Sequence, residues 1–487
     1  MGGGRRRVGG VGMALLLACL AALWASALAG SALAKGPGAG RLDPSFGKGG
    51  KAMAAFPAEN AGDVGVKYDL PFQFTAGHLE MALAPGGKIV VAGSTRIVRL
   101  LANGKPDPQF GAGGSVAISR LPGRTFVLAA AAVDSQGRVL LAGSARPLPS
   151  ESTPDPLISS AVVMRFAADG SVDHSFGDQG VLVSDFGIKP PEIGPTRYKG
   201  AAVGLRSLAV DSQDRPLLTG GFVAKITYCS SAQEAVSTAF VARLTETGTQ
   251  DPSFGDNGLR QVADFSSFEQ GDLFPGGALF AVGLGKPRCG SEGGGPPVVL
   301  TGFGREGNLD PGFGFAGFRV VGYKSAPVAA IAPSGKVVLL GAKENGKQLV
   351  TRLLPNGASD PGFSRTGRIN LIPPKHGAVA AVAVDSQGRL LFAGRVTKRV
   401  SKKKKNQLTR SSFLLARMNP EGSFDRSFGG HGSVRTGFGG PSSSFATQVM
   451  VDAKGRILVG GGVSTPKLNT GGGFALARYL SDPPGRR

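Results

Sequence analysis

The chain has 487 residues, a formal net charge of +22 at pH 7, 78 glycines, 33 prolines and 41% hydrophobic residues. This apolar content argues against a disordered chain, and the glycine and proline content favours many short strands joined by turns. The basic charge predicts attraction to anionic polymers, although solubility alone would also account for it.

Residues 1–34 have the pattern of a signal peptide. Arg5, Arg6 and Arg7 form a basic start, an apolar run extends from Val11 to Ala29, and a small-x-small cleavage site ends at Ala34. We therefore expect a secreted or cell-envelope protein cleaved near Ala34, with a retained membrane anchor as the alternative. No second apolar run is long enough to span a bilayer.

A short phrase, Asp-Pro-x-Phe-Gly followed by another Gly, recurs seven times with small variations. Consecutive copies lie 50 to 78 residues apart. Self-similarity at such a period indicates a repeat architecture in one ring or one array. The anchoring acids are Asp43, Asp107, Asp173, Asp251, Asp310, Asp360 and Asp425, and the phenylalanines are Phe46, Phe110, Phe176, Phe254, Phe313, Phe363 and Phe428.

Each unit contains four strand-like runs between turn signals. In chain order these are an alanine-rich run, a plainly apolar run, a run that ends in Arg and an apolar residue, and a run after the anchor phrase. The small residues of the first run suit the crowded axis of a β-propeller. We expect seven inner strands, near Leu79, Leu128, Ser207, Ala278, Val328, Ala378 and Thr447.

The two ends of the repeat region complement each other. Residues 42–56 supply a fourth strand without the first three, and the chain stops after FALARYLSD, three strands without a fourth. The expected fold is therefore all-β: residues 42–482 form a seven-bladed propeller of four-stranded blades, closed by the N-terminal strand. Residues 35–41 would be a linker and residues 483–487 a tail. An open β-solenoid is the alternative.

Most of the recurring residues have a structural interpretation. An arginine precedes the anchor acid by eight residues in five copies, such as Arg99 and Asp107, which predicts an ion pair or polar network inside each blade. Asp310 lacks this arginine because Gly302 takes its place. The anchor phenylalanines are expected to pack between blades, and the glycine after each is expected in a turn with unusual φ.

Signals for catalysis or metal binding are weak. The D-S-Q-G-R turns suggest a calcium loop, but each offers too few carboxylates, and an Asx-type hairpin turn explains them. The four histidines lack metal-ligand spacing, and no nucleophile motif is present. The sequence thus predicts no catalytic residue, no metal and no cofactor.

Cys229 and Cys289 are the two cysteines beyond the predicted signal peptide. An even count in an exported protein predicts a disulfide, here between long loops of neighbouring units. Two free buried thiols are the alternative.

Long connections follow the second strand or precede the inner strand, and in an up-and-down blade both open onto one face. Such loops on a rigid scaffold are typical carriers of function. Examples are residues 145–160, 224–237 and 396–411, which follow the second strand, and residues 57–77, 187–203 and 266–277, which precede the inner strand. The candidate binding residues on this face are Lys398, Arg399, Lys402, Lys403, Lys404 and Lys405. A solvated loop is the alternative.

The anchor phrase, the x-A-V-D-x-x-G-R run and the segment that links the arginine to the next anchor resemble the delta-60 repeat family over about residues 42–480. That resemblance implies a bacterial, exported, propeller-like repeat protein, and no catalytic residues.

The sequence therefore favours a non-enzymatic exported scaffold that binds a protein or an anionic envelope polymer through the long-loop face. It predicts a monomer with no specific nucleic-acid partner. The alternatives are a propeller lyase or hydrolase acting on an extracellular polymer, and a structural surface protein without a ligand.

Overall fold

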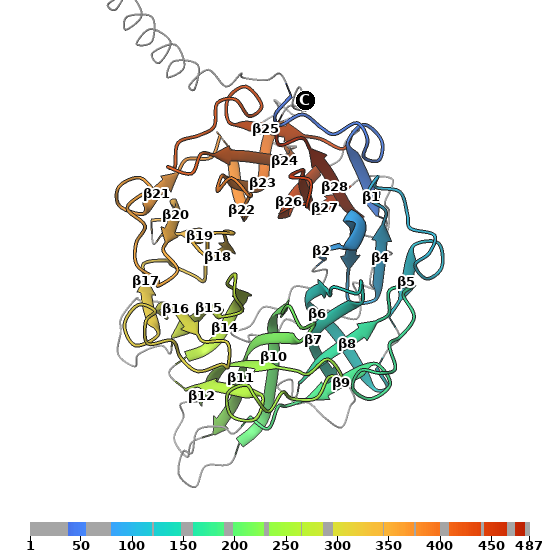
Figure 1. The fold of residues 1–487 in the computed structure, drawn as a ribbon, viewed down its shortest axis with the longest axis vertical. Coiled ribbons are helices and arrows are strands. Elements are labelled where there is room, and N and C mark those ends of the chain that lie inside the picture. Colours follow the sequence, from blue (N-terminus) through green and yellow to red (C-terminus); the bar gives the residue numbers. More distant parts are fainter. Residues whose placement is uncertain are drawn as a thin grey trace, which may run out of the picture.

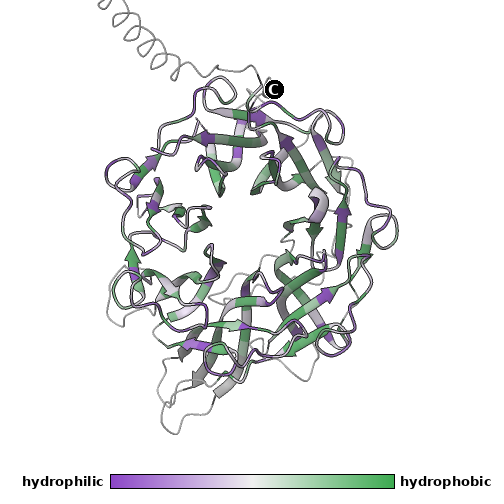
Figure 2. Ribbon diagram, viewed as in Figure 1, coloured by the Kyte–Doolittle hydropathy of each residue, from purple (hydrophilic) through white to green (hydrophobic). Residues whose placement is uncertain are grey.

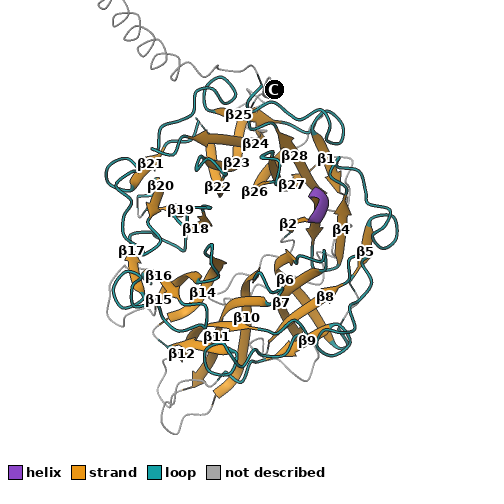
Figure 3. Ribbon diagram, viewed as in Figure 1, coloured by secondary structure: helices purple, strands orange, loops and turns teal. Residues whose placement is uncertain are grey.

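The computed structural model describes residues 38–54, 79–118, 121–147, 159–188, 198–227, 233–263, 265–285, 296–343, 345–374, 376–399, 409–439, 443–464 and 473–482. These residues form seven four-stranded antiparallel sheets arranged as blades in a ring around a central axis (Figure 1). The structure is the predicted seven-bladed β-propeller. Among the described residues, the one helical turn is the 3-10 turn η1 (Pro85–Gly87) between two strands (Figure 3).

The blades follow one another in chain order. Blade 1 contains β2 (Glu80–Ala84), β3 (Lys88–Ala92), β4 (Arg96–Leu100) and β5 (Ser115–Ala117). Blade 2 contains β6 (Arg124–Val133), β7 (Val139–Pro147), β8 (Ser160–Phe166) and β9 (Val181–Ser184). Blade 3 contains β10 (Tyr198–Val210), β11 (Pro216–Thr227), β12 (Gln233–Arg243) and β13 (Leu259–Val262).

Blade 4 contains β14 (Phe265–Leu273), β15 (Leu279–Gly285), β16 (Val298–Phe303) and β17 (Phe318–Val321). Blade 5 contains β18 (Val328–Ile331), β19 (Val337–Ala342), β20 (Gln348–Leu353) and β21 (Arg368–Leu371). Blade 6 contains β22 (Gly377–Val384), β23 (Leu390–Arg399), β24 (Thr409–Met418) and β25 (Ser433–Thr436). Blade 7 contains β26 (Ser443–Val451), β27 (Ile457–Ser464), β28 (Gly473–Tyr479) and, from the other end of the chain, β1 (Lys51–Ala54).

The N-terminal strand closes the ring, as predicted. β1 pairs antiparallel with β28, from Lys51 opposite Ala477 to Ala54 opposite Phe474, and so becomes the outer strand of blade 7 (Figure 1). Closure pairs the outer edge of β28, which would otherwise stay open to strand addition by another chain.

A β-bulge in the inner strand explains a recurrent glycine in the second strand. In blade 6 the register jumps between Val379 and Ala381, which leaves Ala380 without a partner across the sheet. A Cβ added to Gly394 on β23 would lie 2.0 Å from the carbonyl oxygen of Ala378. Because a bulge pushes the backbone out of the pleat, only glycine fits opposite it. Blades 2, 3, 4 and 7 have the same register shift.

Blade 4 corrects two expectations. Its inner strand is β14, and the run near Ala278 that was predicted to be innermost is β15. Residues 266–277, predicted as a long connection, therefore contain a strand. The prediction failed because β14 lacks the alanine-rich pattern and a Pro-Gly-Gly turn replaces D-S-Q-G-R. The long connection after the second strand of blade 3 is also largely a β-ribbon, since β11 reaches Thr227 and β12 begins at Gln233.

The core lies between neighbouring blades. Residues from blades 6 and 7, such as Phe413 and Val459, pack in one buried cluster, and each seam contains a similar one. Figure 2 shows apolar residues along the strands around the whole ring. Burial between blades, rather than within a single domain core, fixes each blade against the next.

Several predicted features lie outside the described residues: the signal peptide, Cys229, Cys289 and Lys402–Lys405. The disulfide, the cleavage and the lysine run stay predictions. No described helix is long and apolar enough to cross a membrane.

Candidate functional site

The anchor acid and the arginine eight residues before it form a buried ion pair in five blades. The sixth such pair closes the ring, because Arg478 on β28 donates to Asp43 near β1. Across the six pairs the arginine Nε lies 2.6 to 2.9 Å from a carboxylate oxygen. The ion pair expected from the spacing is present, and it belongs to the scaffold.

The same arginine also links its blade to the next one. Its guanidinium carbon lies 4.4 to 4.8 Å from the centre of the anchor phenylalanine ring. A terminal nitrogen donates to a carbonyl in the following blade, for example from Arg417 to Ser481 and from Arg165 to Glu246. We call this arrangement of arginine, acid, phenylalanine and following-blade carbonyl the latch. It explains why these four features recur together.

The anchor phenylalanine packs against a glycine of the following blade. The ring of Phe46 lies so close to Gly104 that a Cβ there would approach it to 2.8 Å. Gly104 also has a φ of +81°, so a side chain would be strained as well as crowded. The phenylalanines were predicted to pack between blades, and this contact shows how they do so.

Electrostatics favour the ionised acid in the latch. Burial opposes ionisation of Asp43, but hydrogen bonds from Ser45 and the charge of Arg478 outweigh it and lower the pKa of Asp43. The same balance lowers the pKa of Asp107, Asp173, Asp251, Asp360 and Asp425, with Lys88 and Lys336 adding bonds to two of them. Burial lowers the pKa of Arg478, yet an arginine stays charged at neutral pH.

Blade 4 builds its latch differently. Gly302 replaces the arginine, and a Cβ there would lie 2.5 Å from the Cβ of Phe313. Arg319 on β17 instead donates to the carbonyl of Gly357 and, at 2.9 Å, to Ser359 in blade 5. Asp310 is exposed and has no ion pair among the described residues. The blade-to-blade bond is thus kept while the ion pair is lost.

The D-S-Q-G-R turns are Asx-type turns, as predicted. Asp134 accepts bonds from the backbone N–H groups of Gln136 and Arg138, and its second oxygen pairs with the Arg138 side chain. The turn residues therefore satisfy the carboxylate. Within the part of the chain that the structure describes, no three His, Cys, Asp or Glu side chains are grouped to hold a metal ion.

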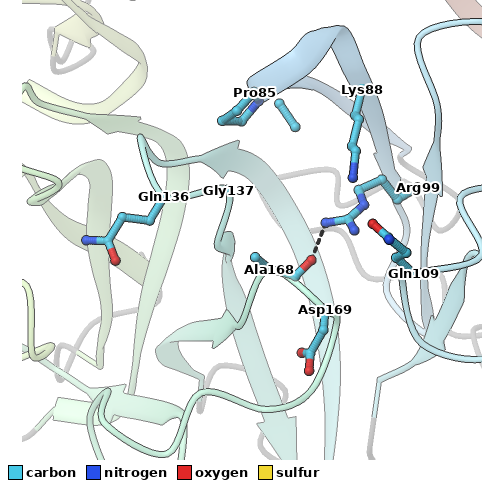
Figure 4. A pocket seen from close by; sticks show the side chains of 9 residues that line it. Pro85, Lys88, Arg99, Gln109, Gln136, Gly137, Ala168 and Asp169 are labelled. Carbon is cyan, nitrogen blue, oxygen red and sulfur yellow. Dashed lines mark hydrogen bonds between the residues drawn. The ribbon is translucent and has the colours of Figure 1, made fainter.

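A hollow of about 430 Å³ lies at the seam between blades 1 and 2, on the face that carries the short turns (Figure 4). Lys88 and Arg99 line it, and both pair with the latch acid Asp107, the lysine at 3.0 Å. Asp169 and Gln136 line the other side. Because its two cations already have a carboxylate partner, we assign the hollow to the latch.

The opposite face, which carries the long connections, has cations of a different kind. We call it the long-loop face. The β23–β24 hairpin extends beyond β22, whose pairing ends at Gly377 opposite Val396. Lys398 and Arg399 lie at the end of β23 and are exposed, as is Arg395. Within the described residues none of these three side chains has an ion pair.

Sequence reasoning missed Arg410 on β24, which lies directly opposite Lys398. Its Nε is buried and has no hydrogen-bond partner. The sequence alone gave no signal for this opposition, because it depends on the register of the folded hairpin.

At the bulge of the inner strand, blades 3 and 4 carry charged residues, whereas the other bulged blades carry uncharged ones. Arg206 and Glu269 occupy the bulge positions of β10 and β14, and their side chains approach to 3.6 Å. In blades 2, 6 and 7 the equivalent residues are Ala129, Ala380 and Thr447.

Asp272 is a second polar departure on the same strand. It pairs with Phe280, at a position occupied by Ala132, Ala209, Ala330 and Ala383 in blades 2, 3, 5 and 6. Burial raises the pKa of Asp272, and its single hydrogen bond, from the Leu273 N–H, opposes this only in part. A comparison of the seven inner strands would have found this residue, but the blade 4 strand was misplaced.

Comparison with known families adds one short match. Residues 85–110 match a family model described as a domain of unknown function (DUF5122) beta-propeller. The match supports a β-propeller repeat family and covers η1, β3, β4 and the second copy of the anchor phrase as far as Phe110. It leaves the delta-60 assignment a prediction. No curated protein shows significant similarity to the chain.

Solved structures are similar to the chain only at low identity and low TM-score. A protein of unknown function from Dyadobacter fermentans is 11% identical with a TM-score of 0.37, covering 81% of this chain and 99% of its own. A gluconolactonase from Xanthomonas campestris is 12% identical with a TM-score of 0.32, covering 90% and 99%. A polysaccharide lyase is 8% identical with a TM-score of 0.33, covering 73% and 90%. At these values the likeness carries no conclusion about activity.

Proposed function

We propose that this protein is a non-enzymatic, exported scaffold that binds an anionic envelope polymer through its long-loop face. One observation carries the proposal: Arg395, Lys398 and Arg399 project from the β23–β24 hairpin without a carboxylate partner among the described residues. On the short-turn face the latch cations Arg99 and Lys88 are paired with an acid, and exposed lysines such as Lys48 and Lys105 lie in separate turns. Unpaired surface cations attract polyanions, and salt screens that attraction.

Export and a disulfide between Cys229 and Cys289 belong to the same proposal. A polymer of the cell envelope is the partner that an exported basic protein would meet. The lysines of the predicted loop, Lys402–Lys405, would add to the same surface. A basic protein partner is disfavoured by like charge, whereas an acidic one would compete for the face.

The test is retention of residues 35–487 on immobilised anionic cell-wall polymer at increasing salt. The test variant changes Arg395, Lys398 and Arg399 to Ser. The control changes three exposed lysines of the short-turn face, Lys48, Lys105 and Lys454, to Ser, which alters net charge equally.

We expect salt-sensitive retention that falls in the test variant and persists in the control. Equal loss in both variants would show that net charge alone drives adsorption. Absence of retention at low salt would overturn the proposal.

A propeller enzyme acting on an extracellular polymer is the second candidate, and Asp272 is the observation that favours it. A carboxyl with a raised pKa is suited to general acid–base chemistry. Turnover of an acidic polysaccharide that disappears in Asp272→Asn, with the fold intact, would replace the scaffold proposal with this one.

A further inference from the structure

The end of the β23–β24 hairpin places two cations directly opposite each other. Lys398 pairs with Arg410 in the register, with no bulge between Leu390 and Arg399. Side chains that are direct cross-strand partners lie on the same side of the sheet, with Cβ atoms about 4.5 to 5.5 Å apart. Like charges directly opposite each other in a sheet are destabilising, so the arrangement is unfavourable without a counterion.

Hydrogen bonding makes the same point independently. The Nε of Arg410 is buried and has no acceptor. A guanidinium N–H withdrawn from water without a partner is costly, because the group loses its hydration and gains nothing in return. The repulsion between Lys398 and Arg410 and the unbonded Nε–H of Arg410 therefore occur at the same place.

The hairpin gives this place two distinct sides. Lys398 follows Phe392 and Val396 along the strand side that packs toward blade 5, and both of those residues are buried. Arg395 and Arg399 lie on the other side, toward blade 7, where Arg399 pairs with Thr409 instead of a cation. The cation pair therefore lies next to the buried, apolar Val396 on one side of the strand. Arg399 lies on the opposite side and is not part of this arrangement.

We propose that Lys398 and Arg410 form an oxyanion subsite that takes one phosphate or carboxylate group of the bound polymer. An oxyanion between the two side chains would neutralise the repulsion and accept from the Arg410 guanidinium. Arginine binds such groups through a planar fork of donors, whereas lysine offers a point charge. This inference rests on the proposed polymer-binding function and adds the group that is recognised and the residues that recognise it.

The test distinguishes the planar guanidinium donors of Arg410 from its positive charge. Affinities of residues 35–487 for inorganic polyphosphate and for polygalacturonate are measured by titration, because the two polymers present phosphate and carboxylate respectively. Arg410→Lys keeps the charge and removes the fork. The matched control is Arg426→Lys, an exposed arginine in the turn between β24 and β25 of the same blade, on the short-turn face.

We expect Arg410→Lys to weaken binding of at least one polymer about tenfold or more, the scale of one charge-assisted hydrogen bond, while Arg426→Lys stays within about twofold. The polymer that shows the loss identifies the group. Without polymer, Lys398→Thr should raise the urea midpoint because it removes the repulsion.

Two results would overturn the subsite. If Arg410→Lys binds both polymers as the parent does, charge alone suffices; the subsite fails while the polymer-binding face stands. If the parent binds neither polymer at low salt, the subsite and the proposed function fail together.

Discussion

The latch that joins the two ends of the chain gives the sharpest test of the fold. Arg478→Met removes the guanidinium and keeps an aliphatic side chain of similar length. The arginine side chain is 3% exposed and its partner Asp43 is 6% exposed, so the pair is buried. The substitution would leave the Asp43 carboxylate with the bonds from Ser45 and without its closest cation.

The expected loss follows from the bonds that disappear. Arg478 donates to Asp43 at 2.8 Å, to Ser45 at 3.0 Å and to the carbonyl of Ala102 in blade 1. Removing one partner of a buried, hydrogen-bonded ion pair costs about 3–5 kcal/mol, mostly because the other charge stays buried. We expect the free energy of unfolding to fall by that amount.

The assay is equilibrium urea unfolding, combined with hydrogen exchange of β1. The control is Arg165→Met, which removes an equivalent latch between blades 2 and 3. Both variants should lose similar stability, but only Arg478→Met should accelerate exchange in β1, since β1 is held at the closure. A loss below about 1 kcal/mol in both variants would refute the reasoning that the latches stabilise the ring.

Three further outcomes are expected. Gly302→Arg restores the repeat pattern, yet it should lower the free energy of unfolding by about 1–3 kcal/mol or more, because Phe313 fills the space. The thermal midpoint should fall accordingly, and a rise in the midpoint would contradict this. Asp272→Ala introduces the residue found in four other blades. Because the folded pKa of Asp272 is raised, its ionisation costs stability as pH rises, so urea unfolding should show a gain at pH 7 that shrinks toward pH 4; equal gains at both pH values would contradict the burial argument. The latch acids have lowered folded pKa values, so their contribution is complete above their unfolded pKa near 4 and is lost as pH falls below it. Thermal midpoints should therefore hold from pH 7 to 5 and drop steeply below pH 4, whereas a flat profile to pH 2 would contradict the latch electrostatics.

Most of the fold could be predicted from the repeat phrase and its spacing. The spacing between arginine and anchor acid indicated the ion pair, and the unmatched runs at the two ends indicated closure through β1, because an unpaired edge strand needs a partner. The sequence did not show that the arginine also bonds the following blade. That contact joins residues 62 to 81 positions apart in five blades, such as Arg99 and Ala168, and 376 positions apart at the ring closure.

Blade 4 shows where pattern reasoning stopped. The bulge at Glu269 interrupts the alternation of β14, and the missing alanines removed the signal used for inner strands. Asp272 was therefore overlooked. The candidate face was predicted from connection lengths, but the opposition of Lys398 and Arg410 depends on a register that only the folded hairpin fixes.

The most direct test of the central claim is hydrogen exchange of the protein with and without saturating polyphosphate or polygalacturonate. The proposed scaffold predicts added protection at the ends of β23 and β24, at residues 395–399 and 409–412. The short turns at residues 102–105 and 452–456 should stay unchanged. Protection at the short turns, or along the inner strands β10 and β14, would contradict a polymer-binding long-loop face.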